Sequence, residues 1–162
     1  MIREAAPADV PALVAMVYEL ADFEKERDSC HLTEDQLRTA LFDPAPQVFC
    51  HVAESAGGEV IGMALWFLTF STWEGIHGIY LEDLYVRPAA RGTGAGRGLL
   101  ATLAAICVER GYRRLEWAVL DWNPARQFYE ALGAAHKSDW LPYRLAGAPL
   151  AALAASTGAR RS

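Results

Sequence analysis

The chain has 162 residues, 52% of them hydrophobic and 22% charged, which is the composition of one globular domain with a sizeable core. A formal net charge of −5 argues against a nucleic-acid-binding protein and agrees with a cationic partner, because an acidic surface attracts cations. The longest apolar run, residues 60–70, is about half the length of a membrane-spanning helix, and the first residues lack the apolar segment of a signal peptide. We therefore expect a cytoplasmic protein that binds neither nucleic acid nor membrane.

The three cysteines, Cys30, Cys50 and Cys107, are too few and too widely spaced for a disulfide framework or a zinc site. Cys107 falls on an apolar helical pattern, which indicates a core residue. The sequence shows no linker and no repeat. It therefore predicts a single domain over residues 1–155, a flexible tail over 156–162, and no metal centre.

The first elements alternate between strand and helix. A short strand is predicted at 2–5, and a helix at 7–26 follows from apolar residues at helical spacing. Thr33 and Gln36 form a capping box, which predicts that a second helix begins there and continues through 33–42.

Three strands are then predicted at 47–55, 60–70 and 78–88, with a hairpin turn at Gly57–Gly58 between the first two. Because no helix separates these strands, they should form an antiparallel meander. The near-continuous apolar character of 60–70 predicts that this strand is buried on both faces.

The second half of the chain returns to alternation. A helix at 94–111 leads to a strand at 113–120, and this crossover should make 113–120 a parallel neighbour of the preceding strand. A helix at 123–133, a last strand at 142–146 and a short helix at 148–155 complete the pattern. The fold class is therefore α/β with a mixed sheet.

The connection between the strand predicted at 78–88 and the helix predicted at 94–111 is rich in glycine and arginine. Glycine lets backbone N–H groups approach an anion, and a helix N-terminus carries partial positive charge, so this connection predicts a phosphate site. A P-loop would need Lys followed by Ser or Thr, and the dinucleotide fingerprint would need glycine where Arg97 or Leu99 stands. The pattern that fits is Arg-x-x-Gly-x-Gly, formed by Arg91, Gly94 and Gly96, and the alternative is a flexible turn.

With this motif the chain resembles the GNAT superfamily of N-acetyltransferases. The stretch LYVRPAARGTGAGRGLL, residues 84–100, is similar to the central segment of that family, and WNPARQFYEALGA, residues 122–134, is similar to its second segment. The strand order agrees, so the resemblance extends over residues 2–146. It implies the GNAT fold, a mixed sheet with a splayed parallel strand pair and helices on both faces. The segments ELADFEKE and TWEG also resemble the diamine acetyltransferase group, which acts on spermidine, spermine or, in one branch, thialysine.

The resemblance implies acetyl-CoA as the co-substrate. In the family, strand backbone before the loop pairs with the pantetheine arm, and the loop amides hold the pyrophosphate. Asn123 would contact the arm, and a role as helix N-cap explains it equally well. The implied cofactor-binding residues are Leu84, Tyr85, Val86, Arg91, Gly92, Thr93, Gly94, Ala95, Gly96, Arg97, Asn123, Pro124 and Ala125.

Two residues are expected to carry the proton transfers. The resemblance places Tyr129 at the tyrosine that protonates the leaving CoA thiolate, and packing beside Phe128 is the alternative. The resemblance makes Glu82 the residue that binds the substrate amine and helps remove its proton, directly or through a water molecule. Glu82 and Asp83 are consecutive on a strand, which predicts that they point to opposite faces. An acid pair in an apolar strand is costly unless it is used, so Asp83 either binds a second ammonium group or is structural.

Further residues are expected to bind the substrate. In the similar group an acid at the position of Glu24 holds the distal amine, with Phe23 beside it, whereas in isolation such a charged stretch is usually a solvated face. Trp73 would line the same site, because aromatic rings suit long cations, and packing is the alternative. His51 and His77 carry no motif.

Together these residues predict an enzyme that transfers an acetyl group from acetyl-CoA to a small cationic amine, by direct attack in a ternary complex. The substrate would be a polyamine or a lysine-like amino acid. The alternatives are acetylation of a protein N-terminus or lysine, and an acyl-CoA-binding regulator without activity. The similar diamine enzymes are homodimers, so the resemblance also implies a homodimer.

Overall fold

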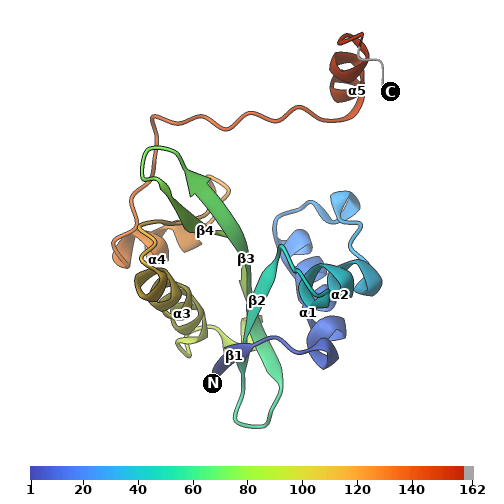
Figure 1. Ribbon diagram of the computed structural model, residues 1–162. Helices are drawn as coiled ribbons and strands as arrows, with labels where there is room; N and C mark the ends of the chain where they lie inside the picture. Colours follow the sequence, from blue (N-terminus) through green and yellow to red (C-terminus); the bar gives the residue numbers. More distant parts are fainter. Residues whose placement is uncertain (159–162) are drawn as a thin grey trace. The chain divides into compact units, whose positions relative to one another are not determined.

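The computed structural model describes residues 1–158, and part of the predicted tail, residues 159–162, lies outside the described residues. The contacts divide the chain into two compact units, Met1–Leu120 and Asp121–Ser162 (Figure 1). Within residues 1–158 no helix has the length and apolar character needed to cross a membrane. One domain over residues 1–155 stays a prediction.

The first unit is built on a five-stranded sheet with the order β1-β2-β3-β4-β5. Neighbouring strands are antiparallel from β1 to β4, and β4 and β5 are parallel. The predicted mixed sheet, with its antiparallel meander and parallel pair, is confirmed. The strands are β1 (Ile2–Glu4), β2 (Phe49–Glu54), β3 (Val60–Ser71), β4 (Ile76–Val86) and β5 (Leu115–Glu116).

The parallel pair is much shorter than the sequence predicts. The strand expected over 113–120 is reduced to the two residues of β5, which pair with Ile79 and Tyr80 of β4. Gly78 permits this approach, because a Cβ atom there would lie 2.9 Å from the carbonyl oxygen of Arg114. Beyond Tyr80 the two strands separate, so in the first unit the rest of this edge of β4 has no strand partner.

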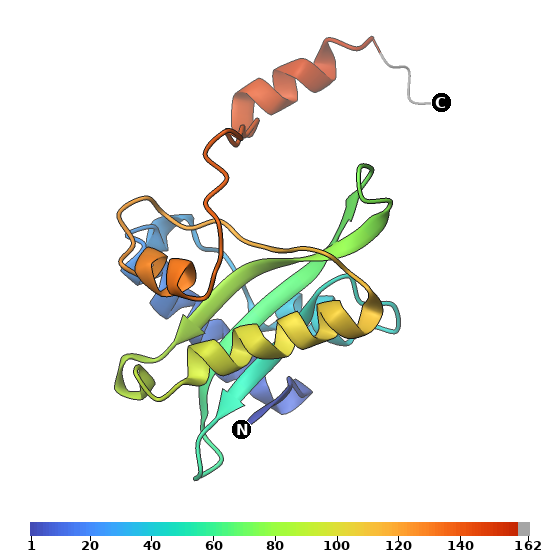
Figure 2. The same cartoon turned by 90° about the vertical axis from the view of Figure 1, so that its left-hand side faces the viewer.

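Helices cover both faces of the sheet, with α1 and α2 on one face and α3 on the other (Figures 1 and 2). The helix expected over 7–26 is divided, because a 3-10 turn precedes α1. The predicted capping box is confirmed: Gln36 donates its backbone N–H to the Thr33 hydroxyl (3.2 Å), and the Gln36 side chain accepts from the Thr33 N–H (3.0 Å). The helices of this unit are η1 (Pro7–Asp9), α1 (Val10–Phe23), η2 (Arg27–Ser29), α2 (Glu34–Phe42), η3 (Pro88–Ala90) and α3 (Ala95–Arg110).

The hydrophobic core lies between the sheet and α1 with α2. Leu13 and Met16 of α1 are fully buried and belong to one cluster with Val52 of β2 and Met63 of β3. Burying one such side chain stabilises the fold by roughly 1.5–3 kcal/mol. The middle of β3 is buried on both faces, as its apolar sequence predicts.

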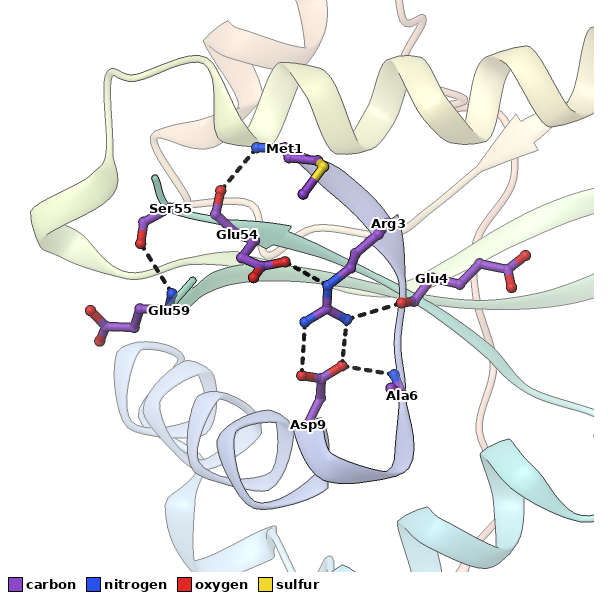
Figure 3. A network of polar contacts seen from close by, with 8 residues as sticks. All are labelled: Met1, Arg3, Glu4, Ala6, Asp9, Glu54, Ser55 and Glu59. Atoms are coloured by element: carbon purple, nitrogen blue, oxygen red, sulfur yellow. Dashed lines mark hydrogen bonds and ion pairs between the residues drawn. The ribbon is translucent and has the colours of Figure 1, made fainter. Parts of the chain in front are cut away.

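An ion-pair network fixes β1 to the start of α1 and to β2 (Figure 3). Arg3 binds the carboxylate of Asp9 with two nitrogens (2.7 and 3.1 Å) and donates from Nε to Glu54 (2.6 Å). Asp9 also accepts the N–H of Ala6 at 2.7 Å. The Arg3 hydrogen bonds lower the pKa of the buried Asp9 carboxyl, so the network holds it ionised.

The second unit contains two helices, α4 (Ala125–Ala131) and α5 (Gly147–Ala155), both near their predicted positions. The strand expected over 142–146 is wrong, because these residues form no strand within the described part of the chain. Pro142 has no N–H to donate to a neighbouring strand, and a segment this short does not specify pairing by itself.

Candidate active site

A loop suited to phosphate precedes α3. Gly92 and Gly94 have φ angles of 79° and 89°, and a Cβ atom at either position would meet nothing within 4 Å. Glycine is therefore required here by backbone conformation and not by space. Gly94 caps the helix and has no side chain, so within residues 1–158 the first N–H groups of the helix, from Ala95 to Arg97, receive no hydrogen bond from an N-cap side chain. These amides and the positive end of the helix fit a pyrophosphate group.

The two arginines of this loop differ in their surroundings. Both are exposed, and Arg97 lies in the first turn of α3. Arg91 donates from Nε to the carbonyl oxygen of Val86 (3.0 Å), and its Cζ lies 5.7 Å from the ring centroids of both Phe23 and Tyr85. The guanidinium of Arg91 therefore lies against α1 and β4.

A β-bulge in β4 positions the two predicted acids. Leu65 of β3 faces Asp83, whereas the next residue, Trp66, faces Leu81, so Glu82 is an extra residue without a partner on β3. Leu81 and Asp83 therefore lie on opposite faces, although residues two apart in a regular strand share a face. Asp83 lies on the α1 side with Leu65. The expectation that Glu82 and Asp83 point to opposite faces rested on regular alternation, which the bulge interrupts.

Three carboxylates gather where the bulge approaches the end of α1. Burial, and then the charges of Glu82 and Glu24, raise the pKa of Asp83 from 3.8 to about 6. Burial, Glu26 and Glu82 likewise raise the pKa of Glu24. Within residues 1–158 none of these three acids forms an ion pair with Lys or Arg. We define Glu24, Glu82 and Asp83 as the acid cluster, and its mutual repulsion favours a cationic ligand.

Tyr80 also belongs to this site, although the sequence did not single it out. Burial, and then the charges of Glu82 and Glu116, raise the pKa of its hydroxyl, which indicates that the hydroxyl lies near both carboxylates. Its ring centroid is 5.2 Å from that of Phe67 on β3. The available signal was the spacing Tyr80-x-Glu82, because an aromatic ring two residues from an acid on a strand can contact the same ligand.

The two aromatic residues expected to bind substrate lie far apart. Phe23 is the last residue of α1, directly before Glu24. Trp73 lies in the turn between β3 and β4 with 82% of its surface exposed. From Ile76, at the end of this turn, Glu82 is roughly 20 Å along β4 at 3.3 Å per residue. Phe23 is therefore next to the acid cluster, and Trp73 is not.

The remaining predicted residues belong to the second unit. The side-chain oxygen of Asn123 accepts a hydrogen bond from the N–H of Ala125 (2.9 Å) at the start of α4. This contact agrees with the helix-capping role that the sequence offers as an alternative. Tyr129 lies on α4, and its ring centroid is 5.5 Å from that of Phe128. Their roles toward acetyl-CoA stay predictions.

The buried cysteines behave as core residues. Burial raises the pKa of Cys50 to about 12 and raises that of the buried Cys107 thiol, so neither is an activated nucleophile. Among residues 1–158 no group of three or more His, Cys, Asp or Glu side chains is arranged to hold a metal ion.

The fold agrees with comparisons to known proteins. The sequence profile of the acetyltransferase (GNAT) family matches residues 14–134. The chain belongs to this family, whose members are acetyl-CoA-dependent N-acetyltransferases.

Individual relatives cover nearly the whole chain. A thialysine N-epsilon-acetyltransferase of Bos taurus is 39% identical over 95% of this chain and 96% of its own length. An L-ornithine N5-acetyltransferase of Arabidopsis thaliana is 28% identical over 94% of this chain and 86% of its own length. The structure of an integron cassette protein from the mobile metagenome of V. cholerae is similar with a TM-score of 0.78 at 28% identity, and covers 95% of this chain and 96% of that chain.

Proposed function

We propose that this acetyltransferase acetylates a primary amine of a small substrate that carries at least two amino groups, such as a thialysine-like or lysine-like amino acid or a polyamine. The acid cluster supports this most directly. It offers three mutually repelling carboxylates, and a second ammonium group on the substrate would relieve the repulsion. The similarity to enzymes named for thialysine and L-ornithine supports the same class.

Acetyl-CoA would supply an activated acyl group as a thioester. The amides from Gly92 to Arg97 would hold its pyrophosphate, and the backbone of Leu84 to Val86, on the edge of β4 that β5 leaves, would pair with its pantetheine arm. Asn123, Pro124 and Ala125 at the start of α4 stay candidates for a further contact.

The amine must lose a proton before it attacks, because an alkyl ammonium has a pKa near 10.4. Glu82 is suited to this role because it is exposed and the bulge turns it out of the β3–β4 ladder. Asp83 and Glu24 would hold the distal ammonium group, with the rings of Tyr80 and Phe23 along the methylene chain. Tyr129 is our candidate for protonating the thiolate that leaves.

The test is thiol release from acetyl-CoA by the purified chain. The amines compared are thialysine, lysine, ornithine, spermidine, putrescine and a lysine peptide. We expect turnover with at least one small diamine and a loss of roughly 10²–10⁴-fold in kcat/KM for Glu82→Gln, the range typical of a general base. Glu109→Gln, a matched change on the exposed surface of α3, should leave turnover unchanged.

Two results would contradict the proposal. Turnover of the lysine peptide alone would indicate a protein substrate, and equal turnover by Glu82→Gln and wild type would remove Glu82 from the proton transfer. The homodimer and the cytoplasmic location are part of the same proposal. A mass near twice 17.7 kDa in solution is expected for the dimer.

A further inference from the structure

Arg91 connects the phosphate loop to the end of α1. The residue is exposed, and its guanidinium contacts the Val86 carbonyl oxygen, 3.0 Å from Nε, and the rings of Phe23 and Tyr85, each centred 5.7 Å from Cζ. Tyr85 is buried on β4, and Phe23 ends α1. A planar guanidinium is suited to this position, because it stacks on aromatic faces while its edge donates hydrogen bonds.

The backbone at the end of α1 fixes Glu24 relative to Phe23. The N–H groups of Lys25 and Glu26 donate to carbonyls of the last helical turn (3.1 and 2.8 Å), which closes the helix. Lys25 has a φ of 62°, in the left-handed region where this turn usually has glycine. A shift of the Phe23 ring therefore also shifts Glu24, the member of the acid cluster that α1 supplies.

The charge of Arg91 acts on the buried Tyr85. Burial, and then a hydrogen bond with Glu19, raise the pKa of Tyr85, and the Arg91 charge lowers it. Glu19 also pairs with Arg87 (3.4 Å). Arg91 and Arg97 are both exposed, but Arg97, in the first turn of α3, makes none of these contacts, so it is the matched arginine for comparison.

We propose that Arg91 is a positioning residue that couples the two substrates: by holding Phe23 against β4, it sets Glu24 within the acid cluster when the phosphate loop binds CoA. This inference rests on the proposed function and extends it. The resemblance implies a direct cofactor contact for Arg91, whereas the geometry directs its side chain toward α1. We expect CoA on the loop to strengthen amine binding at the acid cluster, and because binding free energies are linked, the amine then strengthens CoA binding by the same factor.

The experiment measures how CoA changes amine binding by the full chain. The dissociation constant of thialysine is measured by calorimetry with and without saturating CoA, for wild type, Arg91→Gln, Phe23→Leu and Arg97→Gln. In wild type we expect CoA to tighten thialysine binding by about 5–20-fold, at the lower end of typical coupling. In Arg91→Gln and Phe23→Leu this ratio should fall below about 2-fold. Arg91→Lys should restore it only in part, because lysine lacks the planar group.

The control separates coupling from simple binding. Arg97→Gln should weaken CoA binding and preserve the ratio of the thialysine dissociation constants measured without and with CoA. If Arg91→Gln behaves in the same way, Arg91 is only a phosphate ligand and the inference is wrong. If Phe23→Leu weakens thialysine binding equally with and without CoA, Phe23 only contacts the amine and does not transmit the coupling. A ratio of one in wild type would also overturn the inference.

A second readout distinguishes this inference from the proposed substrate. If wild type binds CoA and no thialysine, the substrate class is wrong, and the coupling is then measured by hydrogen exchange. CoA should slow exchange of the amides at residues 20–26 in wild type and leave them unchanged in Arg91→Gln. Equal protection in both proteins, or no protection in wild type, would overturn the role of Arg91.

Discussion

Replacement of Asp83 by asparagine should stabilise the fold and weaken the enzyme. Asparagine keeps the shape of the side chain and cannot ionise. Burial and the charges of Glu82 and Glu24 raise the pKa of Asp83 from 3.8 to about 6, which corresponds to about 3 kcal/mol at ~1.36 kcal/mol per unit. Because the side chain is only half-buried and solvent screens part of the repulsion, we reduce the expected gain to about 1–2 kcal/mol.

The gain has a definite dependence on pH. Below about pH 4, Asp83 is protonated in the folded and the unfolded chain, and the substitution changes little. Between about pH 4 and 6 the folded chain keeps a proton that the unfolded chain releases, so wild type loses stability as the pH rises. Above about pH 6 Asp83 is ionised in the folded chain, so its full destabilising effect is present. Asp83→Asn should then melt roughly 2–8 °C above wild type.

The assay is thermal unfolding at several pH values between 4.5 and 7.5 (about one unit apart), with Glu109→Gln as the exposed control. Thiol release should fall in Asp83→Asn at every pH, because an acid that faces the amine is lost. A variant less stable than wild type at neutral pH, or a stability difference that does not shrink toward acid, would refute this account of the acid cluster.

Four further predictions concern single residues. Trp66 Nε1 donates to Nδ1 of the buried His51 (3.1 Å), so Trp66→Phe should cost about 1–3 kcal/mol in urea unfolding. Burial lowers the pKa of His51, so the stability it contributes is present above pH 6.5 and should decline on acidification, with a smaller decline in His51→Gln. Gly94→Ala should weaken CoA binding in a calorimetric titration, because its φ of 89° disfavours any side chain; unchanged affinity would show that the loop adapts. Thr33→Ala should lower the unfolding free energy by about 1 kcal/mol through loss of the cap, and no change would mean that water replaces it.

Local signals in the sequence predicted most of the fold. The capping box at Thr33, the apolar run of β3 and the glycines before α3 each act within a few residues, and each has the expected structure. The parallel β4–β5 pair followed from the single helix between the two strands, because such crossovers join parallel neighbours. The strand predicted at 142–146 was wrong: these residues form no strand within residues 1–158, and Pro142 has no N–H to donate to a neighbouring strand.

The geometry of the candidate site depends on contacts that no local pattern contains. The bulge at Glu82 arises from the register between β3 and β4, which two long strands settle together. The motif identified Arg91 as a loop residue, and only the packing of α1 shows that its guanidinium lies on Phe23. Sequence therefore supplied the candidate residues of the site, and tertiary structure determined how these candidates face one another.

The acid cluster links stability to substrate choice. Without a ligand, Glu24, Glu82 and Asp83 repel one another. Together with burial, this repulsion raises the pKa values of Asp83 and Glu24. An amine that brings two positive charges removes this repulsion, and a monoamine of equal length removes only part of it. The number of ammonium groups should therefore determine affinity more strongly than chain length. An enzyme that bound butylamine as tightly as putrescine would show that the acid cluster is a structural feature, and that substrate recognition lies elsewhere.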